Sequence, residues 1–260
     1  MYKKPLSLHL LVCLFLGLYC SKSEDFIIHH QVSGPGETNS YLLYTVKSKK
    51  AALFDVGGRI DTLVSIINDE NLDLKYIFIT HAHPDHVYGI AAIMEKYPKA
   101  KIGISGEEYE DTDLYARWEE ALDSALVAAV KESPPEILDM MNFDFEALGE
   151  PGITLEDDQI LKLGDLRIRT FLSPGHSRGS ICFYVGDALF SGDVLFYRQV
   201  GRTDLPQSGG PEEIVKSVHR LYSSLSDKTK VYPGHGLFTD IGTEKLENEE
   251  VRVESVSLQN

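Results

Sequence analysis

Six consecutive residues, HAHPDH at positions 81–86, hold four side chains that can bind metal ions: His81, His83, Asp85 and His86. Imidazole and carboxylate groups are the ligands that suit zinc, iron and manganese. A lone histidine is more often a packed side chain than a ligand, but packing does not account for four such groups at this density. The sequence therefore predicts a metal site at residues 81–86.

Three further loops carry single candidate ligands: PGHS at 174–177 has His176, SGD at 191–193 has Asp193, and PGHG at 233–236 has His235. Each loop follows an apolar stretch, and its glycine lets the backbone approach closely. With the first cluster they supply five histidines and two aspartates. This is about what two metal ions need when they share a bridging carboxylate and keep room for water.

The loops that carry the candidate ligands mostly follow apolar stretches, which are the elements that must position them. Alternating aromatic and β-branched residues predict strands at 26–32, 41–46, 51–56, 76–79, 159–163, 166–171, 181–185 and 188–190. Helical spacing of apolar residues predicts helices at 59–70, 87–97 and 211–225. The metal loop therefore lies between a strand and a helix.

Residues 107–149 differ in character and are predicted to form a helical insertion. Their apolar positions fall on one helical face, and two prolines then break the run: Leu114, Trp118, Leu122, Ala125, Ala129, Pro134 and Pro135. Two interpretations stay open. In the first, the apolar face packs against the core of the protein, which is the more common role of such a face. In the second, it forms a flap that shapes a substrate pocket.

The four loops, in this order, resemble the metallo-β-lactamase superfamily, and within it the glyoxalase II-like hydrolases. TNSYL at 38–42, LFDVG at 53–57, FSGDVLF at 190–196 and VGRTD at 200–204 are similar to further segments of that subgroup. The resemblance implies an α+β protein with an αββα four-layer sandwich at residues 26–250. It also implies that the aspartate of LFDVG supports the metal loop.

Carried over by residue, the resemblance assigns His81, His83 and His176 to a first metal ion. It assigns Asp85, His86 and His235 to a second ion, with Asp193 bridging the two. Asp85 is in addition the implied catalytic residue, because it can orient the attacking hydroxide. Two divalent ions are implied, zinc first, with iron and manganese as alternatives. No ligand position matches His29, His30 or His219, and Arg202 with Asp204 is expected to form a structural ion pair.

The implied activity is hydrolysis of a thioester by a metal-bound hydroxide. Alternatives are a persulfide dioxygenase with mononuclear iron, a β-lactamase or lactonase, and a non-catalytic metal-binding surface lipoprotein. Glyoxalase II holds glutathione in a C-terminal helical domain, and residues 236–260 are expected to be too few to build one. S-lactoylglutathione is therefore not the expected natural substrate.

The overall charge and the N-terminal residues indicate partners and location. With 40 acidic and 25 basic residues, the net charge is -15. Such a charge repels phosphate backbones, so we expect the protein to act on a small molecule and not to bind nucleic acid. Lys3 and Lys4 precede an apolar run at 6–19, the layout of a signal peptide at 1–20. Export to the periplasm or cell surface is predicted, either by ordinary secretion or with lipidated Cys20 as a membrane anchor. Cys182 is expected to be a core residue.

Overall fold

The strands lie in two six-stranded sheets in the computed structural model, which describes residues 25–110, 118–205 and 207–252. In order across the first sheet come β1 (Phe26–Ser33), β2 (Thr38–Thr45), β3 (Lys50–Phe54), β4 (Asp73–Phe78), β5 (Lys101–Ser105) and β6 (Ile153–Leu155). Across the second come β14 (Thr239–Asp240), β13 (Lys230–Pro233), β10 (Ala188–Gly192), β9 (Ile181–Val185), β8 (Leu166–Leu172) and β7 (Ile160–Leu163). A short hairpin joins β11 (Leu195–Phe196) to β12 (Gln199–Val200).

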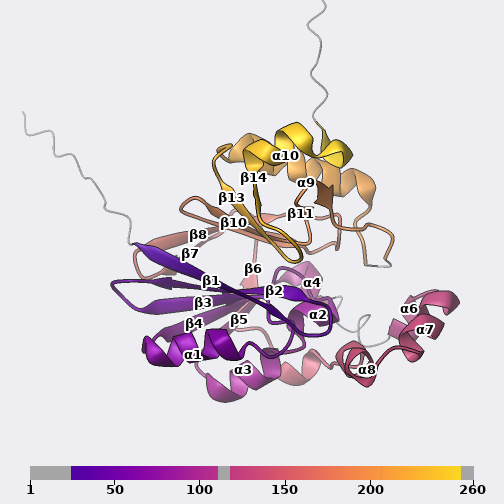
Figure 1. Ribbon diagram of the computed structural model, residues 1–260, viewed down its shortest axis with the longest axis horizontal. Helices are drawn as coiled ribbons and strands as arrows, with labels where there is room; N and C mark the ends of the chain where they lie inside the picture. The colour runs from indigo at the N-terminus through magenta and orange to yellow at the C-terminus, as the bar shows by residue number, and fades with distance from the viewer. Residues whose placement is uncertain (1–24, 111–117, 206, 253–260) are drawn as a thin grey trace, which may run out of the picture.

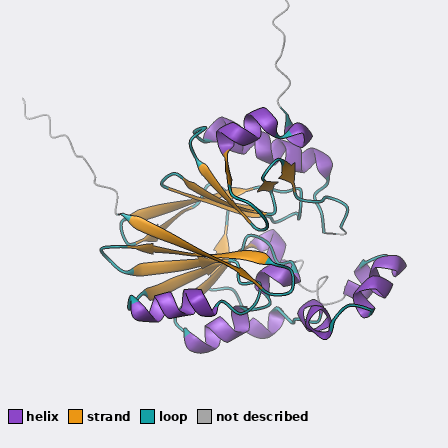
Figure 2. Cartoon of the chain, in the orientation of Figure 1, coloured by secondary structure: helices purple, strands orange, loops and turns teal. Residues whose placement is uncertain are grey.

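The two sheets stack face to face between outer helices (Figure 1). The first sheet is covered by α1 (Asp61–Asp69) and α3 (Ile90–Lys96), and the second by α9 (Pro211–Ser224) and α10 (Ile241–Glu247). Figure 2 shows the same order of helix, strand, strand and helix layers. The predicted αββα sandwich is confirmed.

Strand β2 shows why this sequence builds two layers of core. All eight of its residues are buried, and successive side chains of a strand point to opposite faces. Tyr41 and Leu43 pack between the sheets, whereas Leu42 and Tyr44 pack beneath the helices. Burial of every residue therefore fits a strand that is covered on both faces.

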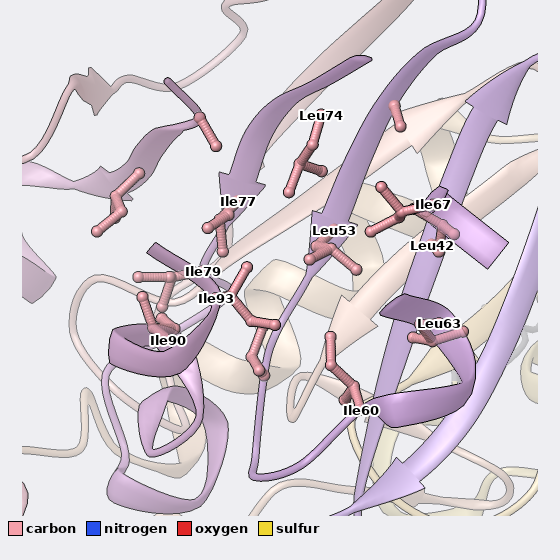
Figure 3. Packing of buried hydrophobic residues seen from close by; sticks show 14 of the residues in the cluster. Leu42, Leu53, Ile60, Leu63, Ile67, Leu74, Ile77, Ile79, Ile90 and Ile93 are labelled. Atoms are coloured by element: carbon pink, nitrogen blue, oxygen red, sulfur yellow. The ribbon is translucent and has the colours of Figure 1, made fainter. Parts of the chain in front are cut away.

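Separate apolar clusters hold the layers together. Leu53 of the first sheet packs with Leu63 of α1 on the helix side (Figure 3). Between the sheets, the rings of Phe54 and Phe190 stack with their centroids 3.9 Å apart. On the far side of the second sheet, Cys182 is fully buried in the cluster that contacts α9, so the prediction that it is a core residue is confirmed.

Strand direction brings the candidate loops to one edge of the sandwich. In the first sheet β3 and β4 run parallel, so the loops after them leave at the same edge. In the second sheet β10 pairs parallel with β13, and β8 runs the same way because both β8 and β10 are antiparallel to β9. The loops after β8, β10 and β13 therefore also emerge together.

The structure corrects several predicted elements. Strands β5 and β6 were not predicted, and β3 ends at Phe54 because Asp55 adopts a left-handed backbone conformation with a φ of 51°. The predicted helix at 87–97 is α3, which starts three residues later than predicted, and a separate short helix, α2 (Pro84–Val87), precedes it within the metal loop. They separate near Gly89, where a Cβ atom would lie 2.2 Å from the carbonyl oxygen of Gly58.

The range predicted as a helical insertion holds several short helices: α4 (Gly106–Glu110), α6 (Trp118–Ala121), α7 (Ser124–Lys131), α8 (Pro135–Met141) and the 3-10 turn η1 (Glu146–Leu148). The apolar stripe is not one continuous face, because Asp123 caps a new helix by accepting from the backbone N–H groups of Ala125 and Leu126. Ala125 and Ala129 are exposed, whereas Trp118 is buried. The core-packing interpretation is therefore wrong for the two alanines. Leu114 lies outside the described residues.

The predicted signal peptide at 1–20, with Cys20, also lies outside the described residues. Within the ranges that the structure does describe, no helix is both long enough and apolar enough to cross a membrane. The chain's last described element is the 3-10 turn η2 (Glu249–Val251), after α10.

Candidate metal centre

Three histidine nitrogens converge in the first of two clusters. Nε2 of His176 lies 3.1 Å from Nε2 of His81 and 2.8 Å from Nδ1 of His83. Tetrahedral zinc with Zn–N bonds of ~2.0–2.1 Å would hold such nitrogens ~3.3 Å apart. The spacing is therefore close to that of three ligands around one metal ion.

The second cluster joins two loops that are far apart in the sequence. Nε2 of His235 lies 3.2 Å from Nε2 of His86 and 3.2 Å from Oδ2 of Asp85. The His86 nitrogen is 3.8 Å from the same Asp85 oxygen. These three side chains form a second group whose ligand atoms share one small space.

Asp193 faces both clusters. Its Oδ1 lies 3.4 Å from Nε2 of His86, and its Oδ2 lies 3.6 Å from Nε2 of both His176 and His235. Oδ2 is thus equally distant from a histidine of each cluster, so the carboxylate lies between the two clusters, as a bridging ligand requires. The structure therefore brings together all seven side chains that the sequence proposed as ligands.

The hydrogen bonds behind the first cluster indicate that a cation belongs there. Nδ1 of His176 donates to the carbonyl oxygen of Arg202 at 2.9 Å, and Nδ1 of His81 lies 3.0 Å from Oγ1 of Thr80. Since these partners assign the ring N–H to Nδ1, the Nε2 lone pairs of the two histidines face each other. Oδ1 of Asp193 is also buried without a hydrogen-bond partner in the described part of the chain. Divalent metal ions would supply the missing partner for these lone pairs and for this oxygen, so the residues fit a metal site.

Charge around the second cluster supports the same conclusion. Burial alone would lower the pKa of His86, but the three carboxylates around it raise that pKa well above its usual value: Asp193, Asp55 and Asp85. Burial would raise the pKa of Asp193, but the histidines around it, His86, His176 and His235, together outweigh burial and lower the pKa to about 2. The carboxylates thus stay ionised and attract positive charge, which a metal ion supplies.

Asp55 supports the metal loop from behind, in the position that the family resemblance implies. Its Oδ1 accepts from the backbone N–H of Thr80, and its Oδ2 accepts from the Thr80 hydroxyl, both at 2.8 Å. Oδ2 also lies 2.9 Å from Nδ1 of His86. Because the Thr80 hydroxyl gives its proton to Asp55, it accepts from His81 Nδ1–H. One buried carboxylate thereby orients a histidine of each cluster.

Asp55→Asn is expected to weaken metal binding by roughly 10–100-fold, the usual effect of losing a carboxylate behind a ligating histidine. The asparagine amide has one acceptor oxygen in place of two, so it cannot accept from the backbone N–H of Thr80 and from Nδ1–H of His86 at the same time, and the support of the metal loop weakens. Competition with a chromophoric chelator measures the affinity. Asp61→Asn, at an exposed position of α1, is the control. Unchanged affinity in Asp55→Asn would show that His86 does not depend on this bond.

Residues at the start of β2 hold the loop that carries His235. Nδ2 of Asn39 donates to the carbonyl oxygen of Pro233 at 3.0 Å, and the Tyr41 hydroxyl donates to the same oxygen at 2.6 Å. Nε2 of His30 lies 2.7 Å from Oδ1 of Asn39. His30, which sequence reasoning left without a role, therefore helps to fix the amide that positions this loop.

Glu108 is the residue that sequence reasoning missed. This fully buried carboxylate accepts from the backbone N–H of Ala82 at 2.8 Å, inside the loop of the first cluster. It also accepts from the Ser177 hydroxyl at 2.7 Å and the Gly179 N–H at 3.2 Å, just after His176. Only its position at the start of the predicted insertion, in the helix that follows β5, could have drawn attention to it, and that strand was not predicted.

A cavity of about 290 Å³ opens onto the first cluster. Four of the candidate ligands line it: His83, Asp85, His176 and Asp193. Three side chains of the insertion line it as well: Trp118, Leu122 and Met141. The flap interpretation of the insertion therefore fits these three residues. The expected ion pair is also present, since Arg202 contacts both oxygens of Asp204 at 2.7 and 2.9 Å.

Acid is expected to destabilise the metal-free protein through the buried side chain of His83. Burial lowers the pKa of His83 from 6.5 to about 3. Between these values the unfolded chain takes up a proton that the folded chain does not, so stability falls as pH drops from 6.5 toward 3. Urea midpoints of chelator-treated protein should follow this trend, and His83→Gln should show a weaker slope. An identical slope in both proteins would contradict it.

Comparison with known proteins gives the class. Residues 33–235 match the Metallo-beta-lactamase superfamily. The probable metallo-hydrolase YqgX of Bacillus subtilis is 32% identical over 221 residues, 83% of this chain and 92% of that protein. The hydroxyacylglutathione hydrolase GloC of Haemophilus influenzae is 31% identical over 210 residues, 77% of this chain and 86% of that protein. The crystal structure of the BLEG-1 B3 metallo-beta-lactamase has a TM-score of 0.68 and 30% identity, covering 86% of this chain and 99% of that one.

The chain therefore belongs to the metallo-beta-lactamase superfamily, as its loop motifs predicted. Within that superfamily it is a metal-dependent hydrolase.

Proposed function

We propose that this protein hydrolyses thioesters at a two-metal centre that holds zinc. The observation that carries the proposal is the position of Asp193, whose carboxylate lies between the two ligand clusters, 3.6 Å from Nε2 of His176 in one and of His235 in the other. A thiolate is a good leaving group and a soft metal ligand, which suits such a centre. The Haemophilus relative is named as a hydrolase of hydroxyacylglutathione, itself a thioester, which supports the same class.

The metal ligands and the carboxylate of Asp85 have different roles in the proposed reaction. Divalent ions bound here would lower the pKa of a water from ~15.7 toward ~7 and polarise the substrate carbonyl. Burial would raise the pKa of Asp85, but His86, His235 and His83 together outweigh burial and hold that pKa well below the usual range. Asp85 is therefore ionised at neutral pH and can orient the attacking water by accepting a hydrogen bond. The Thr38 hydroxyl fixes the Asp85 backbone, donating to its carbonyl at 2.8 Å.

A substrate panel with metal analysis tests the proposal. The purified protein is expected to hold two zinc ions per chain and to hydrolyse thioesters in preference to lactones and the β-lactam nitrocefin. His83→Ala should lose thioester hydrolysis and bound metal together, whereas His29→Ala, which lies outside both clusters, should lose neither. Turnover of nitrocefin or lactone without thioester hydrolysis, or an active metal-free His83→Ala, would contradict the proposal. Full metal content without turnover of any substrate would favour a non-catalytic metal-binding protein.

A second candidate is a persulfide dioxygenase with one iron ion. The GRTD segment at 201–204 favours it, because Arg202 lies at the cavity beside the first cluster and is paired with Asp204. One iron per chain, with oxygen uptake in the presence of glutathione persulfide, would support this candidate. Two zinc ions and no oxygen uptake would exclude it.

We further propose that the protein is exported, acts on a small molecule outside the cytoplasm, and is anchored by lipid on Cys20. The basic residues at 3 and 4, the apolar run at 6–19 and the cysteine that follows support this. Fractionation should find the wild type with membranes and Cys20→Ser in the soluble exported fraction. Wild-type protein in the soluble exported fraction would indicate ordinary secretion.

A further inference from the structure

The cavity beside the first cluster has an apolar wall that its ligands do not provide. Trp118 and Leu122 line it from the start of the insertion, Met141 lines it from the end of α8, and Leu205 lines it from the loop after the Arg202–Asp204 pair. Trp118 is only 4% exposed, and its ring Nε1–H donates to the side-chain oxygen of Asn142 at 3.3 Å. Its ring is therefore held in place as part of the wall.

The same cavity has few charged side chains that could bind a substrate with several negative charges. Among the described residues that line it, Arg202 is the one side chain with a permanent positive charge, and it is paired with both oxygens of Asp204. A peptide-like thiol such as glutathione carries two carboxylates and needs fixed cations or donors to bind them. An apolar chain needs only contact area, which this wall supplies.

We propose that the cavity binds an apolar acyl chain, so that the preferred substrates are thioesters of unsubstituted aliphatic acids rather than of short hydroxy acids. This inference rests on the proposed thioesterase function. Asp85 and Asp193 line the same cavity as Trp118, Leu122 and Met141, so a thioester whose carbonyl reacts at the centre that the carboxylates form has apolar side chains within reach of its acyl chain. The insertion would then determine which acyl groups the enzyme selects, while the metal clusters carry out the reaction.

Binding of alkyl hydroxamic acids to the zinc-loaded full chain tests the inference without needing hydrolysis. The hydroxamate group binds the metal, and the alkyl chain reports on the cavity. From acetohydroxamate to hexanohydroxamate, Kd measured by calorimetry is expected to fall about threefold to fourfold for each added methylene. In Trp118→Ala the fall should be less than about twofold per methylene. Leu126→Ala, at an exposed position of α7 that does not line the cavity, should behave as the wild type.

The outcomes separate this inference from the proposed function. Equal affinity along the series, absence of binding, or a Trp118→Ala variant with the wild-type slope would overturn the acyl-chain inference, even for an active thioesterase. A normal slope in a protein that hydrolyses no thioester would support the apolar cavity and reject the proposed reaction. Hydrolysis of acetyl, butyryl and hexanoyl thioesters of one small thiol should rank in the same order as the hydroxamates.

Discussion

Asp193→Asn is expected to lower kcat/KM for thioester hydrolysis by on the order of 10³-fold, because it removes the charged group that both clusters share. Each oxygen of Asp193 faces histidine nitrogens at 3.4–3.6 Å. Asparagine has the same shape, but it offers one oxygen in place of two and no negative charge. The variant should therefore fold and yet bind fewer than two metal ions per chain.

Steady-state kinetics and metal analysis on the same sample check this prediction. Asp187→Asn is a matched control, since Asp187 is exposed in the turn before β10 and the substitution changes charge by the same amount. If Asp193→Asn kept two tightly bound ions and most of its activity, the bridging role would be wrong. A loss of activity with both ions retained would instead assign Asp193 a role in orienting the attacking water.

Glu108→Ala is expected to destabilise the fold by roughly 3 kcal/mol or more, because three buried donors would lose their acceptor. Those donors are the backbone N–H groups of Ala82 and Gly179 and the hydroxyl of Ser177. Glu108→Gln keeps the volume and one acceptor oxygen, so it should lose less. Both variants should also bind metal more weakly in the first cluster, since Ala82 and Ser177 belong to the loops that carry its ligands.

Urea unfolding of chelator-treated protein isolates the effect on the fold from the effect on metal binding. Glu107→Ala is the matched control, because its side chain is exposed beside Glu108 on the same short helix. An unfolding curve of Glu108→Ala that coincides with that of Glu107→Ala would show that the buried carboxylate contributes nothing to stability. Equal losses in the Gln and Ala variants would show that all three accepted bonds require the full carboxylate.

The ligand set could be predicted from the sequence because metal binding restricts residue type and local spacing very strongly. Histidine and aspartate are the groups that coordinate such ions, and a strand followed by a glycine turn places them at a strand end. The same local argument predicted most strands around the site and, through the motifs, the superfamily that the comparison confirmed. The support of the metal loop by Asp55 also followed from a local motif.

Other parts of the centre depend on residues that only tertiary contacts bring together. Glu108 has an ordinary sequence neighbourhood, and its role arises because β5 ends beside the loops of His81 and His176. The contact of His30 with Asn39 depends likewise on the pairing of β1 with β2. A buried hydrogen bond constrains position in space rather than spacing along the chain, so such partners leave no pattern in the sequence.

The cluster at residues 81–86 shows the same division. The residue types by themselves predicted that these side chains bind metal as a set and that three distant loops complete it, because ligand chemistry is a property of residue types. The family resemblance implied how the set is divided, and the tertiary structure brings His176 to His81 and His83, and His235 to Asp85 and His86. Only the tertiary structure decided between the two interpretations of the insertion, because Trp118 and Leu122 line the cavity whereas the alanines of the same stripe are exposed. The direction of a side chain follows from how whole sheets and loops pack, which is a property of the folded chain.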